Sequence, residues 1–273
     1  MSDDGVELPV TSSEEPSWAP EAHACYQGVI RHLLQAKVPF AVSGGFAFHH
    51  HTGIWRVTKD LDLVLPPDAV PGAFRVLVDE GFETYVQDPV WLAKARRGEY
   101  FVDLITGVGN ATLTVEQSWI DRAQEDEVLG IRCKVLSAEE MIASKLFVTR
   151  RERFDGADIA HLLRAHARSL DWDRLKGLTG AHWEMLYWAL ILFAYVYPAR
   201  TGDVPLEVWR EMTGRFERLI RSSNGSLPFR GTLVDPKMFA IDVNEWGERD
   251  PYRELCKNYP HPLKEINTTR SKE

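Results

Sequence analysis

The stretch TKDLDLVL, residues 58–65, decides the fold class of this chain. Its acidic and apolar residues alternate, which is typical of a β-strand, where residues two apart face the same side. Asp60 and Asp62 therefore point to one face, while Leu61 and Leu63 enter the core. Two carboxylates on one face repel each other unless a cation lies between them. Mg²⁺ suits such a pair, because it takes a few carboxylates and completes its shell with water and substrate phosphates.

A strand end with solvated aspartates is the alternative for this short pattern, and a third acid bears on the choice. Asp103 interrupts the apolar run FVDLI, residues 101–105. A single charge in such a strand is costly to bury unless it is paired or bound to a metal. If this strand lies beside residues 60–62, three carboxylates converge, as they do in a two-metal site. The other candidate partners of Asp103 are the basic residues Lys94, Arg96 and Arg97.

A diglycine turn precedes the acidic strand, in the run SGGFAF at residues 43–48. Glycine permits close approach of the backbone, and the N-terminus of a helix favours phosphate. Turns between strands and helices use glycine routinely, so the pair alone is weak evidence. The order of strand, diglycine, helix and acidic strand is much more specific.

Together with WRVTKDLD, residues 55–62, this run resembles the first motif of the DNA polymerase β-like nucleotidyltransferase superfamily. The pairing of Gly-Gly with R-x-T-x-D-x-D is similar to the AbiEii-like branch, known from type IV toxin–antitoxin systems. The third carboxylate of that branch, on a later strand, is matched by Asp103, and its helical lysine is matched by Lys145. Its final Arg and Asp cluster resembles RFDGADI, residues 153–159, although here Phe154 separates the arginine from the aspartate. The resemblance covers about residues 38–165.

The resemblance implies an α+β fold, with a polymerase β-type nucleotidyltransferase core (a mixed sheet with flanking helices) followed by a helical region. It implies Mg²⁺ or Mn²⁺ as cofactor and an NTP as substrate. The implied catalytic residues are Asp60, Asp62, Asp103 and Lys145, of which the three aspartates are also the metal ligands. The implied nucleotide-binding residues are Ser43, Gly44, Gly45, Arg56, Thr58, Arg153 and Asp158.

Structural alternatives stay open for the basic residues and for the last acidic cluster. Lys145 is otherwise a surface lysine on a helix, and Arg56 contacts phosphate or braces the acidic strand. Arg153 and Asp158 contact the nucleotide or pair within the helical part. Asp155 is interpreted as an N-cap.

Four parts are expected in the 273-residue chain: a disordered tail over 1–17, the nucleotidyltransferase core over 18–136, a helical region over 137–225 and a C-terminal extension over 226–273. The pattern of apolar residues and turn residues predicts the individual elements. Helices are expected at 20–37, 46–52, 69–80, 137–150 and over most of 155–221, strands at 39–42, 61–65, 100–105 and within 127–135, and a structured stretch at 238–246.

Composition and charge describe an ordinary globular protein, with 44% hydrophobic and 26% charged residues. The net charge of -8 mildly disfavours a large nucleic-acid partner. Three scattered cysteines favour a reducing compartment over a disulfide framework or a structural zinc site. The longest uncharged apolar run, residues 185–197, is shorter than the roughly 20 residues of a membrane span. With no signal-peptide pattern at the start, the sequence predicts a cytoplasmic protein without a membrane segment.

Three functions compete at this point. The first is a metal-dependent nucleotidyltransferase whose acceptor hydroxyl belongs to tRNA, a protein or a small molecule such as an aminoglycoside, and which as a toxin would have an antitoxin partner. The second is a non-catalytic module on the same fold that binds a nucleotide or a partner; the presence of all three carboxylates and of Lys145 argues against it. The third is an unrelated phosphohydrolase, which requires a further histidine or carboxylate cluster. The adjacent His49, His50 and His51 do not supply one, because neighbouring helical residues point about 100° apart.

Overall fold

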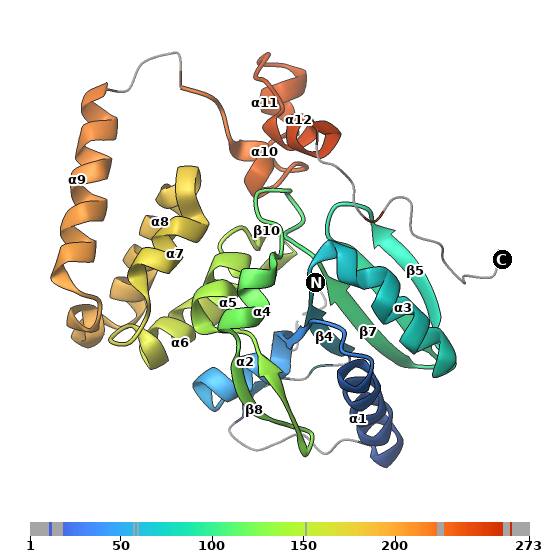
Figure 1. Cartoon of the computed structure of the whole chain (residues 1–273). Helices are drawn as coiled ribbons and strands as arrows, with labels where there is room; N and C mark the ends of the chain where they lie inside the picture. Colours follow the sequence, from blue (N-terminus) through green and yellow to red (C-terminus); the bar gives the residue numbers. More distant parts are fainter. Residues whose placement is uncertain are drawn as a thin grey trace, which may run out of the picture.

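The computed structural model describes residues 11–12, 19–56, 58, 60–150, 152–222, 227–258 and 263. Its central element is a mixed seven-stranded sheet with the strand order β5-β6-β7-β4-β2-β9-β8 (Figure 1). In that order the strands are Glu83–Asp88, Leu92–Arg97, Tyr100–Ile105, Asp60–Val64, Ala41–Val42, Ile131–Val135 and Gln124–Val128.

Two parallel strands at the middle of the sheet, β4 and β7, carry the acidic residues. Their register places Asp62 beside Asp103 and Leu61 beside Val102. Side chains that are register partners on adjacent strands face the same side of the sheet. The fully buried Leu61 and Val102 therefore occupy one face, and both aspartates occupy the other.

Helices cover both faces of this sheet. On the leucine face lie α1 (Pro20–Gln35) and α3 (Val70–Asp79), which pack on each other. On the acidic face, α2 (Gly44–Thr52) begins immediately after β2 and packs on α6 (Gly156–His166). A short strand, β3 (Trp55–Arg56), returns the chain from α2 towards β4. The first turn of α2 is thereby held against the acidic residues.

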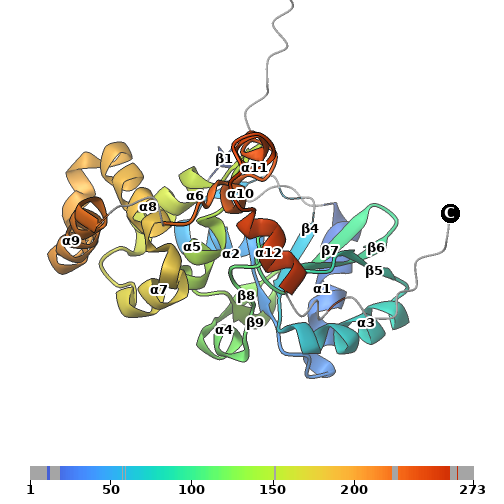
Figure 2. The same cartoon turned by 90° about the horizontal axis from the view of Figure 1, so that it is seen from above.

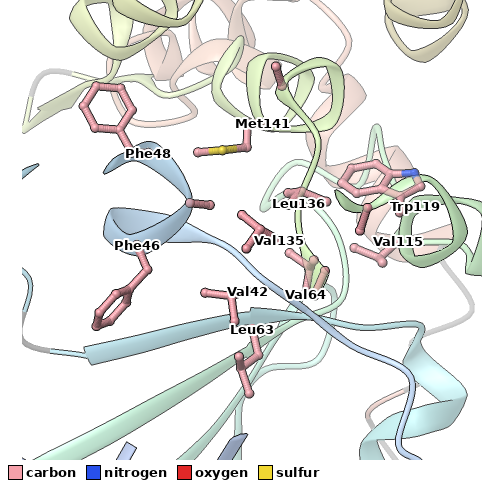
Figure 3. Close-up of a cluster of buried hydrophobic side chains, with 14 of the residues drawn as sticks. Val42, Phe46, Phe48, Leu63, Val64, Val115, Trp119, Val135, Leu136 and Met141 are labelled. Carbon is pink, nitrogen blue, oxygen red and sulfur yellow. The ribbon is translucent and has the colours of Figure 1, made fainter. Parts of the chain in front are cut away.

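The second half of the chain is helical and continues the same hydrophobic core. Figure 3 shows strand residues such as Val42 and Val135 next to Phe48 of α2 and Met141 of α5. These side chains belong to one contiguous buried cluster that extends into α8. Figure 2 shows α7, α8 and α9 at the end of the molecule away from α3. The remaining helices are α4 (Gln117–Arg122), α5 (Ala138–Lys145), α7 (Trp172–Thr179), α8 (Trp183–Val196), α9 (Leu206–Ser222), α10 (Gly231–Val234), α11 (Ala240–Asn244) and α12 (Pro251–Asn258), with 3₁₀ turns at Pro67–Ala69, Gly180–His182 and Pro198–Asp203.

Most predicted elements are confirmed, and three segments differ from their prediction. The helix expected over 137–150 ends at Lys145, because Thr149–Arg150 pairs as β10 with β11 (Arg153–Phe154). Strands β5 and β6 were not predicted, since their mixed polar sequences lack a regular alternation. Within the tail expected to be disordered, Thr11–Ser12 pairs as β1 with β3. The other residues of that tail lie outside the described part of the chain.

Among the residues that the structure describes, none of the helices combines the length and the apolar character that a membrane span requires.

Candidate active site

The structure brings Asp60, Asp62 and Asp103 together on the acidic face of the sheet. One carboxylate oxygen from each lies within 4.8 Å of the others. Alternation along β4 aligns the first two, and the parallel register with β7 supplies the third. Across the described residues, no other group of three or more His, Cys, Asp or Glu side chains comes as close. The predicted metal ligands therefore form a single constellation.

Burial and mutual repulsion act on these carboxylates in the same direction. Burial, followed by the charges of Asp60 and Asp103, raises the pKa of Asp62 to about 7. Burial also raises the pKa of Asp103 above its usual value, against the effect of a hydrogen bond from Lys94. Carboxylates that resist ionisation because of their neighbours gain stability from a cation between them. The donor set, all oxygen, fits Mg²⁺ or Mn²⁺.

Lys94 of β6 is the direct partner of Asp103. Its Nζ lies 2.9 Å from Oδ1 and 3.0 Å from Oδ2 of that carboxylate, and the two residues are register partners. Asp103 thus lies next to Asp60 and Asp62 and also forms an ion pair with Lys94. The two environments that the sequence offered for it as alternatives occur together. Arg96 instead donates to the carbonyl of Gly98, and Arg97 donates to that of Glu80.

The diglycine turn lies directly against the acidic strand. Gly44 has a φ of +56°, and a Cβ at that position would overlap the carboxylate of Asp62. A Cβ on Gly45 would lie 3.1 Å from Cβ of Thr58. The amide of Ser43 donates to the carbonyl of Asp62 over 2.8 Å. Glycine is therefore required here by both backbone conformation and space, and it brings the N-terminus of α2 to the acids.

Thr58 holds Asp60 in place. Its hydroxyl lies 3.1 Å from the carboxylate Oδ1 of Asp60 and 3.1 Å from its carbonyl oxygen. A hydroxyl that donates to a carboxylate restricts its rotation. We therefore assign Thr58 a supporting position behind Asp60, one of the predicted metal ligands.

A second charged cluster, which we call the α6 network, connects α5, β3 and β11 to the start of α6. Lys145 Nζ lies 2.6 Å from Oδ2 of Asp155 and 2.9 Å from Oδ2 of Asp158. Arg56 forms an ion pair with Asp158, and Arg153 Nε lies 3.0 Å from Oδ1 of Asp155. The network comprises Lys145, Arg56, Arg153, Asp155 and Asp158.

These contacts decide several alternatives that the sequence left open. Lys145 is nearly buried, with 13% of its side chain exposed, so it is not a surface lysine. Asp155 occupies the N-cap position of α6, but its side chain makes no capping hydrogen bond. It forms ion pairs with Lys145 and Arg153 instead. Burial opposes ionisation of Asp155, yet Lys145 and Arg153 outweigh it and hold its pKa below the usual value. Arg56 pairs with Asp158 and braces α6 rather than β4.

The α6 network extends its positive charge to the acidic constellation. The charges of Lys145 and Arg153 lower the pKa of Asp62, against the larger effects of burial and of the neighbouring acids. Conversely, a hydrogen bond to Asp155, followed by the charges of Asp155, Asp62 and Asp60, raises the pKa of Arg153. A cationic rim therefore borders the three acids on the side of α6. Its positive charge would attract an anionic ligand bound next to the acids.

The three adjacent histidines of α2 differ in their contacts. His49 stacks on Trp55 with ring centroids 3.9 Å apart, and Nδ1 of His50 contacts Asp126. His51 lies 2.7 Å from the carbonyl oxygen of Leu136 through Nε2 and 3.1 Å from Nε2 of His166 through Nδ1. The contact with His166, which joins α2 to α6, was not expected, because no local pattern relates residues so far apart.

Comparison with known proteins assigns most of the described core to a protein family. The family described as nucleotidyl transferase of unknown function (DUF2204) matches residues 23–178, more than half of the chain. A search of curated proteins finds no match. Solved structures that are similar include the antibiotic-resistance factor ANT(2'')-Ia, at 16% identity over 62% of this chain and 94% of that one, with a TM-score of 0.42.

Two further solved structures are similar at the same low level. One is an antigenic nucleotidyltransferase-like protein from Paracoccidioides brasiliensis, at 18% identity over 72% of this chain and 94% of that one, with a TM-score of 0.40. The other is JHP933 from Helicobacter pylori, at 12% identity over 83% of this chain and 99% of that one, with a TM-score of 0.35. Values of this size do not identify a substrate.

Proposed function

This chain belongs to the nucleotidyl transferases of unknown function, and from that premise we propose that it transfers a nucleoside monophosphate from an NTP to a hydroxyl acceptor in a metal-dependent reaction. The observation that carries the proposal is the convergence of Asp60, Asp62 and Asp103 within 4.8 Å, next to the first turn of α2. A geometric site is needed beyond the family, because one fold supports many functions.

Asp60, Asp62 and Asp103 are the residues that would hold the divalent cations. Such ions, when bound, neutralise charge on the transferring phosphoryl group and activate the attacking oxygen. Thr58 fixes the carboxylate of Asp60. Gly44 removes the Cβ that would displace the carboxylate of Asp62. Both supports lie within the motif that identified the site in the sequence.

The phosphates of the nucleotide would lie between the diglycine turn and the cationic rim. Ser43, Gly44 and Gly45 present backbone at the N-terminus of α2, where partial positive charge favours an anion. Arg153 and Lys145 place positive charge close enough to Asp62 to lower its pKa against the other effects. Lys145 is shared between two aspartates, so it acts on phosphate mainly through its field rather than through a free ammonium group.

Asp103 is the candidate for the proton acceptor. The acceptor hydroxyl must lose its proton as the new bond to the α-phosphorus forms and the bond to pyrophosphate breaks, and a carboxylate within hydrogen-bond reach can receive it. Lys94 favours the ionised form of Asp103 through a direct hydrogen bond, which burial opposes. An ionised Asp103 is the form that accepts the proton.

The nature of the acceptor separates the finer versions of this proposal. The resemblance to the AbiEii-like branch supports a toxin that modifies tRNA or a protein and has an antitoxin, whereas the net charge of -8 favours a small acceptor. A non-catalytic binding module on the same fold is the alternative function. It predicts nucleotide binding without turnover.

The deciding experiment incubates the purified protein with each α-labelled NTP, Mg²⁺ or Mn²⁺, and either total RNA, cell lysate or a panel of hydroxylated small molecules. We expect label transfer to one acceptor class, release of pyrophosphate, and loss of both with Asp60→Ala. Binding of NTP without any transfer across all metals and acceptors would favour the binding module. Growth arrest on expression that requires Asp60 would support the toxin version.

A further inference from the structure

A cavity of about 550 Å³ is lined mainly by residues of α1, α2 and the β8–β9 hairpin. Sites for small molecules usually have volumes of about 300–1,000 Å³. None of the three acids of the candidate active site and no member of the α6 network lines this cavity. Its described lining residues are His23, Gln27, Phe46, His49, His50, Gly53, Trp55, Asp126, Glu127, Val128, Leu129 and Gly130.

Aromatic rings form one wall of the cavity. Trp55 and Phe46 are 7% and 4% exposed, and their rings meet edge to face with centroids 5.8 Å apart. The ring of His49 stacks on that of Trp55. Interlocked rings of this kind lose little conformational freedom when a ligand packs against them, so the wall is already organised for an apolar group.

The hairpin side of the cavity carries negative charge. Asp126 and Glu127 line it, and His50 contacts the carboxylate of Asp126. Hydrogen bonds from the amide of Glu127 and from His50 hold the pKa of Asp126 below its usual value, so it is ionised at neutral pH. Gln27 donates to the carbonyl of Leu129 over 2.6 Å, which fixes the hairpin against α1. Neither lysine nor arginine occurs among the described lining residues.

The C-terminal end of α2 adds to this negative potential. α2 closes at Gly53, a C-cap with a φ of +68° that also lines the cavity. The last carbonyl groups of a helix carry a partial negative charge and favour a cation nearby. Carboxylates, helix C-termini and aromatic rings each attract ammonium ions. A phosphate or carboxylate ligand would meet repulsion at the same place.

We propose that this cavity is a binding site for a small organic amine, whose apolar body packs on Phe46 and Trp55 while its ammonium group faces Asp126. The site goes beyond the proposed transfer reaction and does not depend on it. Gly44 and His50, at the two ends of this arrangement, are six residues apart on α2, which corresponds to about 9 Å along a helix. The amine site and the acidic constellation thus share a helix but no lining residue.

Three small probes of similar shape test the charge preference: phenethylamine, 2-phenylethanol and 3-phenylpropanoate. Each is titrated into the full-length protein, without nucleotide, and followed by ligand-observed NMR. We expect phenethylamine to bind most tightly, the neutral alcohol more weakly and the carboxylate weakest. Binding of the carboxylate as tightly as the amine, or no saturable binding of any probe, would overturn the proposal.

Neighbouring residues of β8 provide a matched pair of variants. Asp126→Asn keeps the shape of the side chain and removes its charge, so we expect phenethylamine affinity to fall by about three- to tenfold. Glu125→Gln removes a charge from an exposed side chain that pairs with Arg132 and does not line the cavity, so affinity should stay the same. Circular dichroism and NTP binding, unchanged in both, would show that the loss is local. Equal losses in the two variants would refute the assigned position of the ammonium group.

Discussion

Asp62 on β4 and Asp158 on α6 are aspartates that both feel the charge of Lys145, yet their surroundings differ. Asp62 lies beside two other acids, and its pKa is raised to about 7. Asp158 is buried at 2% exposure but pairs with Lys145 and with Arg56. The acidic constellation has an excess of negative charge, whereas in the α6 network three basic side chains more than compensate two carboxylates. Charge balance, rather than the presence of acids, separates a candidate metal site from a structural cluster.

The largest effect expected from this comparison is on catalysis. Asp62→Asn should lower the rate of nucleotide transfer by about 10³-fold or more, because a metal ligand and its charge are lost from the transition state. Label transfer from NTP under single-turnover conditions measures it. A loss of less than tenfold would mean that Asp62 does not bind the metal.

The same variant should keep its folding stability, so that its loss of activity cannot be attributed to unfolding. The pKa of Asp62 is about 7 in the folded state, against an ordinary value of 3.8. The folded state therefore binds more protons between these values, and this carboxyl lowers stability as pH rises through that window. Without metal at pH 7, thermal melting of Asp62→Asn should occur at the same temperature as wild type or higher. A lower melting temperature would contradict this view of the acidic constellation.

The second effect is on stability and concerns the α6 network. Asp158→Asn leaves the nearly buried Lys145 and Arg56 short of a partner, and breaking a buried pair costs about 3 kcal/mol. Urea unfolding monitored by circular dichroism measures the free energy of unfolding. The control is Asp173→Asn, because Asp173 is 93% exposed and pairs with Lys176; its cost should stay under about 1 kcal/mol. Similar costs for both variants would remove the distinction between the two clusters.

The third effect separates backbone strain from close packing at the diglycine turn. Gly44→Ala must adopt a positive φ and also place Cβ against the Asp62 carboxylate. Gly53→Ala needs a positive φ too, but in the described part of the chain its Cβ would meet no atom of a non-neighbouring residue within 4 Å. A left-handed conformation costs about 1–2 kcal/mol for alanine, so Gly44→Ala should exceed Gly53→Ala in destabilisation and should alone lose Mg²⁺ binding. Calorimetric titration with Mg²⁺ and urea unfolding check both; equal effects would argue against contact with Asp62.

The smallest effect concerns the joint between α2 and α6, which connects the two clusters. Burial lowers the pKa of His51 to about 4 from an ordinary value of 6.5. The unfolded state binds more protons between those values, so stability is complete above about pH 6.5 and falls as the pH decreases towards 4. At pH 5 the loss attributable to His51 should be roughly 1–2 kcal/mol. Urea unfolding from pH 7 to pH 5 should show a shallower decline in His51→Gln; identical slopes would show that His51 is not buried in its neutral form.

The order of elements was largely predictable from the sequence, because its signals are local. An apolar run that ends at Thr106 and Gly107 predicts β7 at its observed bounds, Tyr100–Ile105. Turn residues divide the helices from α6 to α9 near their observed ends. The helix predicted to reach Arg150 was wrong because pairing of β10 with β11 depends on residues beyond the helix signal. The strand pair that holds Asp103 beside Asp62 needed only the assumption that β4 and β7 are neighbours.

Local sequence patterns were sufficient to predict which residues would form the candidate active site. Two aspartates at alternate positions, a third acid in an apolar run and a diglycine before a helix are short-range patterns, and they fix which side chains share a face or meet at a turn. Only the tertiary structure decided how their charges balance. Lys94 reaches Asp103 from an unpredicted strand, Lys145 is shared by two aspartates of another helix, and a cavity forms where three distant segments meet. The lysines and their partners lie on different elements, and the cavity joins segments far apart in sequence, so the periodicity of a single helix or strand does not encode these contacts.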